Sequence, residues 1–169
     1  WFIGIKTYLK NDRLIIKIKL LLSLMTRFSQ QKDLSLTPML FLRKTKEGKD
    51  VPHDARLMIK MRPEVPSFLG IQVQISINEV QGYDYPYLYC VLIAKKNSGF
   101  LDKYPFITSK TCENLTVEHS SSGAVEILVI RQTTTKTSGF ETPPNQCLSI
   151  VKSAISTAEK LIKSKLPSS

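Results

Sequence analysis

The densest group of side chains that could bind a ligand follows a predicted strand that ends near residue 131. The group combines a guanidinium, an ammonium and several hydroxyls, and its members are Arg131, Thr133, Thr134, Thr135, Lys136, Thr137 and Ser138. Such donors bind phosphate or another anion where they converge at the N-terminus of a helix, because the helix dipole favours negative charge there. The glycine and lysine spacing of the Walker phosphate-binding loop is absent. We therefore predict an anion-binding site, and the alternative is a polar connection between a strand and a helix.

Few residues could carry out catalysis or bind a metal. His53 and His119 are the only histidines, and neither stands at the spacing of paired metal ligands on a helix. Glu126 lies among apolar residues, and we expect it to pair with a basic residue or to lie at an exposed edge. No catalytic residue, metal or cofactor is predicted. The alternative is an enzyme that uses the loop after Arg131 to act on an anionic or phosphorylated substrate.

Basic residues are concentrated in the N-terminal part of the chain. Of the formal net charge of +10, residues 1–50 carry +7, since 11 lysines and arginines stand there against 4 acidic residues. Four of the bases recur at helical spacing, and they are Lys6, Lys10, Arg13 and Lys17. A second stripe at helical spacing is apolar and consists of Leu14, Ile18, Leu21, Met25 and Phe28. Residues 1–28 are therefore predicted to form a basic amphipathic segment, helical rather than extended.

Three interpretations fit this basic segment. It is a core helix whose lysines face water, a helix that rests on an anionic membrane surface, or a contact for nucleic acid. A membrane-spanning helix inside residues 1–28 is not expected, because Lys17 and Lys19 interrupt an apolar run that is shorter than the roughly 20 residues a span requires. The chain begins at Trp1 rather than at methionine, so we expect it to be a segment of a longer protein.

The middle of the chain has the periodicity of a sheet. Four β-branched residues alternate with polar ones, as in a strand with one face in a core, and they are Ile71, Val73, Ile75 and Ile77. Residues 87–94 are apolar or aromatic throughout, which is typical of a central strand. We predict an antiparallel pair joined by an irregular loop over residues 79–86, a span too long for a two-residue turn. Residues 115–119 and 124–131 are predicted to form a second hairpin with a four-residue loop.

Tyrosines occupy every second position at the start of the apolar run, at Tyr83, Tyr85, Tyr87 and Tyr89. A row of aromatic rings on a sheet can stack the bases of single-stranded nucleic acid, but such surfaces need basic residues between the rings. The residues between these tyrosines are Asp84, Pro86 and Leu88. We therefore expect the rings to pack beneath a helix, with their hydroxyls at its rim.

The remaining segments are predicted as follows. Residues 39–42 form a short apolar strand or half-turn, residues 43–50 an exposed loop, and residues 97–111 an irregular region with packed aromatic side chains. A helix follows over residues 143–166, capped by Thr142, and its apolar stripe consists of Leu148, Val151, Ile155, Ala158 and Ile162.

The three cysteines do not predict a disulfide framework. Cys90, Cys112 and Cys147 are an odd set without close spacing, and such a small number is unusual for a disulfide-stabilised chain of 169 residues. Cys90 is expected to be a small core residue. These observations favour a reducing compartment, so we expect a cytoplasmic location, at the inner face of a membrane if the protein is tethered.

Together these patterns predict one α+β domain over residues 1–169. It has a basic N-terminal segment (1–28), a mainly antiparallel sheet of about five strands (55–131) and a C-terminal helix (143–166), with the helices packed on the sheet. The predicted function is a non-enzymatic binding or interaction domain, the soluble part of a membrane-associated protein. Its expected partner is an anionic membrane surface or another protein, and nucleic acid is the less favoured alternative.

Overall fold

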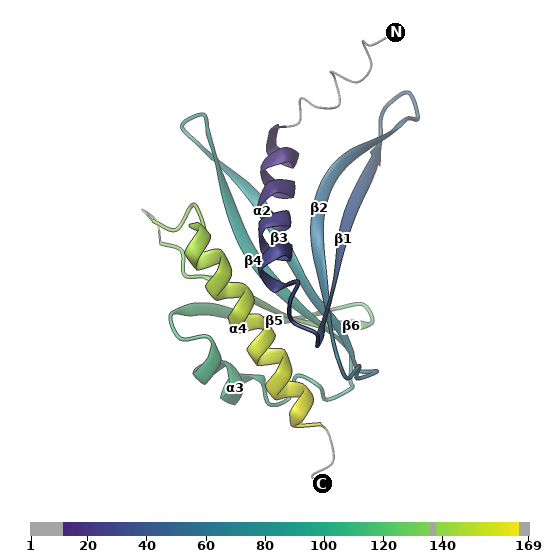
Figure 1. The fold of residues 1–169 in the computed structure, drawn as a ribbon, viewed down its shortest axis with the longest axis vertical. Helices are drawn as coiled ribbons and strands as arrows, with labels where there is room; N and C mark the ends of the chain where they lie inside the picture. Colours follow the sequence, from purple (N-terminus) through teal and green to yellow (C-terminus); the bar gives the residue numbers. More distant parts are fainter. Residues whose placement is uncertain (1–11, 136–137, 166–169) are drawn as a thin grey trace.

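The computed structural model describes residues 12–135 and 138–165 and has the predicted α+β fold (Figure 1). Its sheet has six antiparallel strands in the order β1-β2-β3-β4-β6-β5, one strand more than the five predicted. The strands are β1 (Leu34–Lys44), β2 (Asp50–Met61), β3 (Phe68–Val80), β4 (Tyr83–Lys95), β5 (Leu115–Ser122) and β6 (Val125–Gln132). The helices are α2 (Asp12–Phe28), α3 (Tyr104–Thr111) and α4 (Pro144–Lys163).

Helices α2 and α4 cover the same face of the sheet (Figure 1). Helix α2 packs mainly on β2, whereas α4 packs on β4 and β6 and carries α3 on its side. The period-two pattern of the strands supplies the other half of the core, because every second side chain points toward these helices. One row across the sheet consists of Leu57, Val73, Cys90 and Ile130, whose side chains are fully buried. No helix of the described part covers the opposite face.

The two long helices form because their apolar residues recur at the helical period. Helix α2 buries Leu14, Leu21, Leu24 and Phe28. Helix α4 buries a broader stripe that includes Val151, Ile155, Ala158 and Ile162. The predicted cap of α4 was wrong: Pro143 is the N-cap residue, and no side chain bonds to the first turn.

Thr142 instead holds the start of α4 against β4. Its hydroxyl accepts a hydrogen bond from the backbone N–H of Leu88 at 2.9 Å, and its own N–H donates to the carbonyl of Pro86 at 2.9 Å. Two prolines follow Thr142, and neither has an N–H to donate. The Thr142 side chain is therefore not used by the first turn of α4. It bonds instead to β4, a strand that is distant from it in the sequence.

Both predicted hairpins exist, but their loops are shorter than expected. Strand β3 runs to Val80 and β4 begins at Tyr83, so the loop predicted over residues 79–86 is a two-residue turn. Its residues Gln81 and Gly82 have φ angles of 53° and 82°, as in the type I′ turn that suits the twist of a hairpin. Glutamine seldom adopts a positive φ, so the sequence signal was weak. The second hairpin likewise turns over residues 123–124 rather than four residues.

Two segments differ from the sequence prediction. Residues 39–42, predicted as a short apolar strand or half-turn, are the middle of the edge strand β1. The full length of β1 was not predicted, because the strand contains Pro38 and has no buried residue that would give an alternating pattern. Only residues 45–49 of the predicted loop over 43–50 are turn, because β1 continues to Lys44 and β2 starts at Asp50. The region predicted to be irregular contains α3, in which Pro105 occupies the first turn, where no N–H is needed.

The sheet is splayed between β2 and β3. The two strands pair only where Leu57–Ile59 meets Ile71–Val73, and beyond this short ladder they separate. Helix α2 lies over the part where they diverge (Figure 1). The helix therefore connects two halves of the sheet that have few backbone bonds between them.

Candidate functional site

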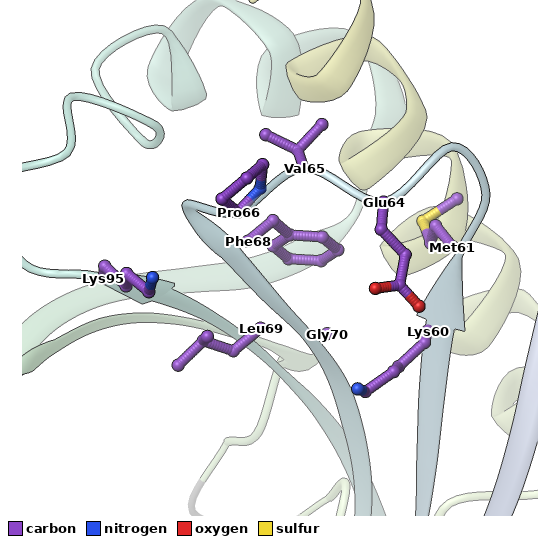
Figure 2. A pocket seen from close by; sticks show the side chains of 9 residues that line it. All are labelled: Lys60, Met61, Glu64, Val65, Pro66, Phe68, Leu69, Gly70 and Lys95. Carbon is purple, nitrogen blue, oxygen red and sulfur yellow. The ribbon is translucent and has the colours of Figure 1, made fainter.

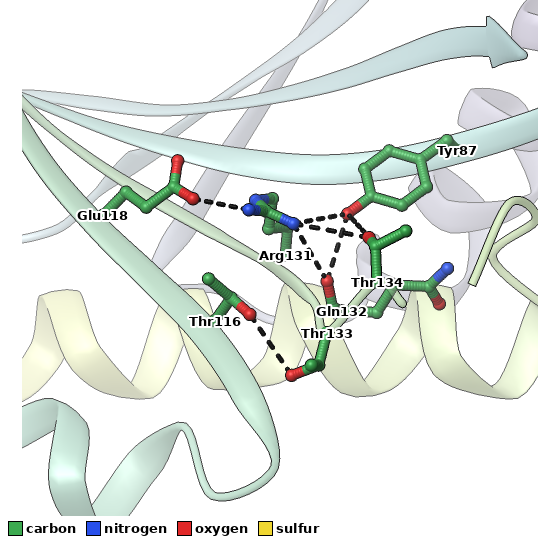
Figure 3. A network of polar contacts seen from close by, with 7 residues as sticks. All are labelled: Tyr87, Thr116, Glu118, Arg131, Gln132, Thr133 and Thr134. Atoms are coloured by element: carbon green, nitrogen blue, oxygen red, sulfur yellow. Dashed lines mark hydrogen bonds and ion pairs between the residues drawn. The ribbon is translucent and has the colours of Figure 1, made fainter. Parts of the chain in front are cut away.

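The predicted anion site centres on Arg131 of β6, on the face of the sheet that no described helix covers (Figure 3). The Arg131 guanidinium donates to the Tyr87 hydroxyl at 3.3 Å and to Thr134 Oγ1 at 3.4 Å, and its other nitrogen donates to the Glu118 carboxylate. The Tyr87 hydroxyl in turn donates to the Gln132 carbonyl at 3.1 Å. Four segments therefore meet at one guanidinium.

The sheet register explains why these residues meet. Tyr89 of β4 is paired with Arg131, and Arg131 is paired with Thr116 of β5. Side chains two residues apart on neighbouring strands share a face, so Tyr87 and Glu118 lie diagonally from Arg131. The tyrosines thus lie on the uncovered face and not beneath a helix as predicted, because the core side of β4 is occupied by the even-numbered residues from Leu88 to Ala94.

The other residues of the predicted site do not all converge on Arg131. Thr133 Oγ1 lies 3.2 Å from Thr116 Oγ1, to one side of the cluster. Thr135 and Ser138 bond to each other, with 2.6 Å between their hydroxyl oxygens, and close a turn of their own. Lys136 and Thr137 lie outside the described residues. Among the described residues of the predicted set, the structure brings Arg131 and Thr134 together.

Gln132 was not predicted as a site residue, although its side chain fixes the loop that follows β6. Its buried side-chain amide donates to the carbonyls of Gly139 and Glu141, at 2.8 and 2.7 Å. Gly139 lies so close to the strand that an added Cβ would stand 3.0 Å from the Thr133 carbonyl oxygen. A buried glutamine at a strand end is a recognisable signal for such a clamp, because a buried amide must find hydrogen-bond partners.

The Arg131 guanidinium is already paired with the Glu118 carboxylate. The hydrogen bond to Glu118, and after it the one to Tyr87, raises the pKa of the guanidinium above its usual value. The Glu118 side chain is 54% exposed, so this carboxylate can move away into water. An anion would therefore bind Arg131 by displacing Glu118, in a site that also offers the hydroxyls of Tyr87 and Thr134.

Two described basic residues of the N-terminal segment, Arg13 and Lys17, are also paired with carboxylates. Arg13 bonds to Glu79 and, at 3.0 Å, to Asp84, both of which belong to the β3–β4 hairpin. Lys17 Nζ lies 2.6 Å from Asp54 Oδ1 on β2. Lys6 and Lys10 lie outside the described residues. An external polyanion would have to compete with these internal pairs for Arg13 and Lys17.

The candidate catalytic residues have structural partners. Glu126 accepts a hydrogen bond from the backbone N–H of Asn97 at 3.1 Å and lies 3.9 Å from His119 Nε2. The His119 ring packs against Tyr104 of α3, with 5.1 Å between the ring centres. Within the described residues no group of three or more histidine, cysteine or acidic side chains could hold a metal ion.

A second basic surface, which the sequence did not indicate, lies where α3 packs on α4. Lys103, Lys110 and Lys160 surround a hollow of about 370 Å³ together with Phe106. None of the ion pairs between described residues includes these three lysines. The Phe106 side chain is 67% exposed, and Lys110 Nζ lies 4.2 Å from the centre of its ring. We call these four residues the α3–α4 basic patch.

The described part of the chain contains no helix with the length and apolar character needed to cross a membrane.

Comparison with known proteins supplies no relative from which a role could be transferred. No protein-family model, curated protein or solved structure matches the chain.

Proposed function

We propose that this chain is a non-enzymatic binding domain, the soluble part of a membrane-associated protein, and that it contacts an anionic lipid surface through the α3–α4 basic patch. The single observation that supports this proposal is that an exposed phenylalanine, Phe106, lines one hollow together with three lysines that have no carboxylate partner among the described residues.

The chemistry of the patch suits the interface between water and lipid headgroups. Ammonium groups near an anionic membrane each contribute about 1 kcal/mol of attraction. An exposed aromatic ring adds apolar contact at headgroup depth, and lysines beside it can keep their charge in water while their carbon chains pack on apolar groups. Lys103, Phe106 and Lys110 recur at helical spacing at the start and along one side of α3, and Lys160 of α4 lines the same hollow, so all four are close together on the surface.

The acidic neighbours of the patch weaken this attraction only in part, because two carboxylates stand against three lysines. Asp102 and Glu159 are adjacent in sequence to Lys103 and Lys160, and neither is neutralised by an ion pair with a described residue. In contrast, Arg13 and Lys17 of the N-terminal segment are tied to carboxylates of the sheet. The patch is therefore the more available of the two basic surfaces, and Lys6 and Lys10 are proposed as additional contacts.

Co-sedimentation with vesicles tests the proposal. The full chain is mixed with vesicles that contain phosphatidylserine and with neutral phosphatidylcholine vesicles, and we expect binding to the former only. The triple variant K103Q/K110Q/K160Q should bind roughly 100-fold more weakly, because three contributions of about 1 kcal/mol are removed.

A matched variant separates the patch from the net charge. K32Q/K46Q/K49Q removes the same charge from exposed lysines that form no ion pair with a described residue, and it should retain most of the binding. Equal losses in the two triple variants, or equal binding to neutral vesicles, would overturn the proposal. The contribution of the N-terminus is best measured by deleting residues 1–11, since a longer deletion removes Leu14 and Leu21 from the core.

A further inference from the structure

A second hollow, of about 340 Å³, lies at the connection between β2 and β3 and shares no lining residue with the α3–α4 basic patch (Figure 2). Its lining combines charged side chains with apolar ones, and the apolar ones include Val65, Phe68 and Leu69. Lys60 of β2 and Lys95 of β4 lie on opposite sides of Leu69 and Gly70, and the Glu64 carboxylate projects beside Lys60 (Figure 2). The volume falls in the lower part of the range of small-molecule sites, roughly 300–1,000 Å³.

The chain forms this hollow through an irregularity at the start of β3. The register with β4 shifts between Phe68 and Gly70, which leaves Leu69 out of the ladder with 37% of its surface exposed. Gly70 has a φ of +127°, and a Cβ there would lie 2.9 Å from the carbonyl oxygen of Ile59. The base of the hollow is therefore backbone, and its walls are the side chains on either side. The ring of Phe68 is held in place by stacking on Phe100, with 4.9 Å between ring centres.

The charges at the hollow are not neutralised within the described structure. Lys60, Lys95 and Glu64 are absent from its ion pairs, so two ammonium groups and one carboxylate border an apolar surface. A ligand with one negative charge is attracted by this arrangement, whereas Glu64 repels a second negative charge. The exposed Leu69 and the ring of Phe68 favour an apolar body attached to the charged group.

We infer that this hollow binds a small amphiphilic monoanion, a single carboxylate on an aliphatic or aromatic body, with Lys60 and Lys95 as its charge partners. The inference goes beyond the proposed function and does not depend on it, because the two sites share no residue. The apolar body lies on Leu69 and Phe68, and the carboxylate is attracted by the ammonium groups of Lys60 and Lys95 on either side of them.

Titrations followed by NMR test the inference on the full chain. Octanoate, octanol and inorganic phosphate are added separately, octanoate below its micelle concentration, and the amide signals of Leu69 and Gly70 are followed. Octanoate should shift both signals saturably. Octanol, which has the same tail without the charge, should bind at least tenfold more weakly, and phosphate, which has the charge without the tail, should not saturate the site.

Variants identify the groups responsible. K60Q/K95Q should reduce the affinity for octanoate to that for octanol, whereas K32Q/K46Q, which removes the same charge elsewhere, should leave it unchanged. L69Q is a second test that keeps both ammonium groups and removes an exposed apolar contact, and it should weaken octanoate and octanol alike. Equal affinity for octanoate and octanol would overturn the inference. So would shifts confined to a different apolar hollow, which lies between α2 and β1 and is lined by Leu22 and Leu40. Binding of octanoate should persist in K103Q/K110Q/K160Q, so failure of the membrane proposal and failure of this one are distinguishable.

Discussion

Lys17 Nζ lies 2.6 Å from Asp54 Oδ1, and this ion pair joins α2 to β2 in the region where β2 has separated from β3. The same helix is joined through Arg13 to Glu79 and Asp84, at the far end of the β3–β4 hairpin. Helix α2 thus contacts both halves of the splayed sheet. Arg13 and Lys17, two of the basic residues that suggested a membrane contact in the sequence, also have a structural role, because they link the two halves of the sheet where the ladder between β2 and β3 is missing.

Replacement of Asp54 by asparagine should destabilise the protein by about 1–3 kcal/mol, because a partly buried pair loses one member and Lys17 and Arg56 lose their shared acceptor. Only 16% and 20% of the Lys17 and Asp54 side chains are exposed. Urea unfolding measures the change. The control is Asp50→Asn: the Asp50 pair with Lys44, at 3.6 Å, is largely exposed, and its loss should cost less than about 0.5 kcal/mol. Equal effects of the two variants would contradict a structural role for the α2 pair.

The pH dependence of the unfolding free energy should also reveal the ionisation of Asp54. Burial of the carboxyl group opposes its ionisation, but hydrogen bonds from Lys17 and Arg56 outweigh burial and lower the pKa of Asp54 below its usual 3.8. The unfolded chain therefore binds this proton first as the pH falls, and the stabilisation present at neutral pH decreases below about pH 4. The difference in unfolding free energy between wild type and Asp54→Asn should be constant from pH 5 to 7 and shrink toward pH 3. A difference that grows on acidification would contradict the assignment.

The three cysteines should be unreactive in the folded protein. All three are free and buried, and burial raises the pKa of Cys147 to about 11 and that of Cys90 well above its usual value. Because the thiolate is the reactive form, a thiol reagent at pH 8 should label the native protein slowly and label all three cysteines quickly in urea. Rapid labelling of one cysteine without denaturant would show that its burial is incomplete in solution.

The Arg131 cluster can be tested by removing its internal competitor. Glu118→Gln should raise the affinity for inorganic phosphate by up to roughly fivefold, since an exposed ion pair is worth up to about 1 kcal/mol. The measurement is the shift of the Arg131 side-chain N–H signals during a phosphate titration. Arg131→Gln should abolish the response of the neighbouring Thr134 amide. An unchanged affinity in Glu118→Gln would mean that phosphate does not use this guanidinium.

Local patterns predicted the fold class, because alternation in β3 and the apolar stripe of α4 each report the face that is buried. Strand β1 was recognised only in part since it lies at the sheet edge, where none of its residues is buried, and α3 was hidden by the breakers Gly99 and Pro105. The Arg131 cluster and the α3–α4 basic patch, in contrast, depend on contacts between residues that are distant in the sequence. Glu118 and Tyr87 reach Arg131 only through the register of three strands, and Lys160 lies beside the same hollow as Lys103 only because α3 packs on α4. Spacing along a single segment carries no information about such neighbours.

Gly70→Ala should cost more than about 2 kcal/mol of unfolding free energy. A side chain at this position is strained at a φ of +127°, and its Cβ would also stand 2.9 Å from the Ile59 carbonyl oxygen and 3.0 Å from Met58 Sδ. The control is Gly82→Ala, which has a φ of +82° but nothing within 4 Å of the added carbon, so it carries strain without the clash. Urea unfolding should therefore rank Gly70→Ala well below Gly82→Ala in stability.

Because β2 and β3 touch over only a short ladder beside Gly70, the lost free energy should appear as faster hydrogen exchange of the Leu57 and Ile59 amides. Equal costs for the two alanines would mean that β2 can move away from β3 freely, and the hollow bordered by Lys60 and Lys95 would then lack a fixed base.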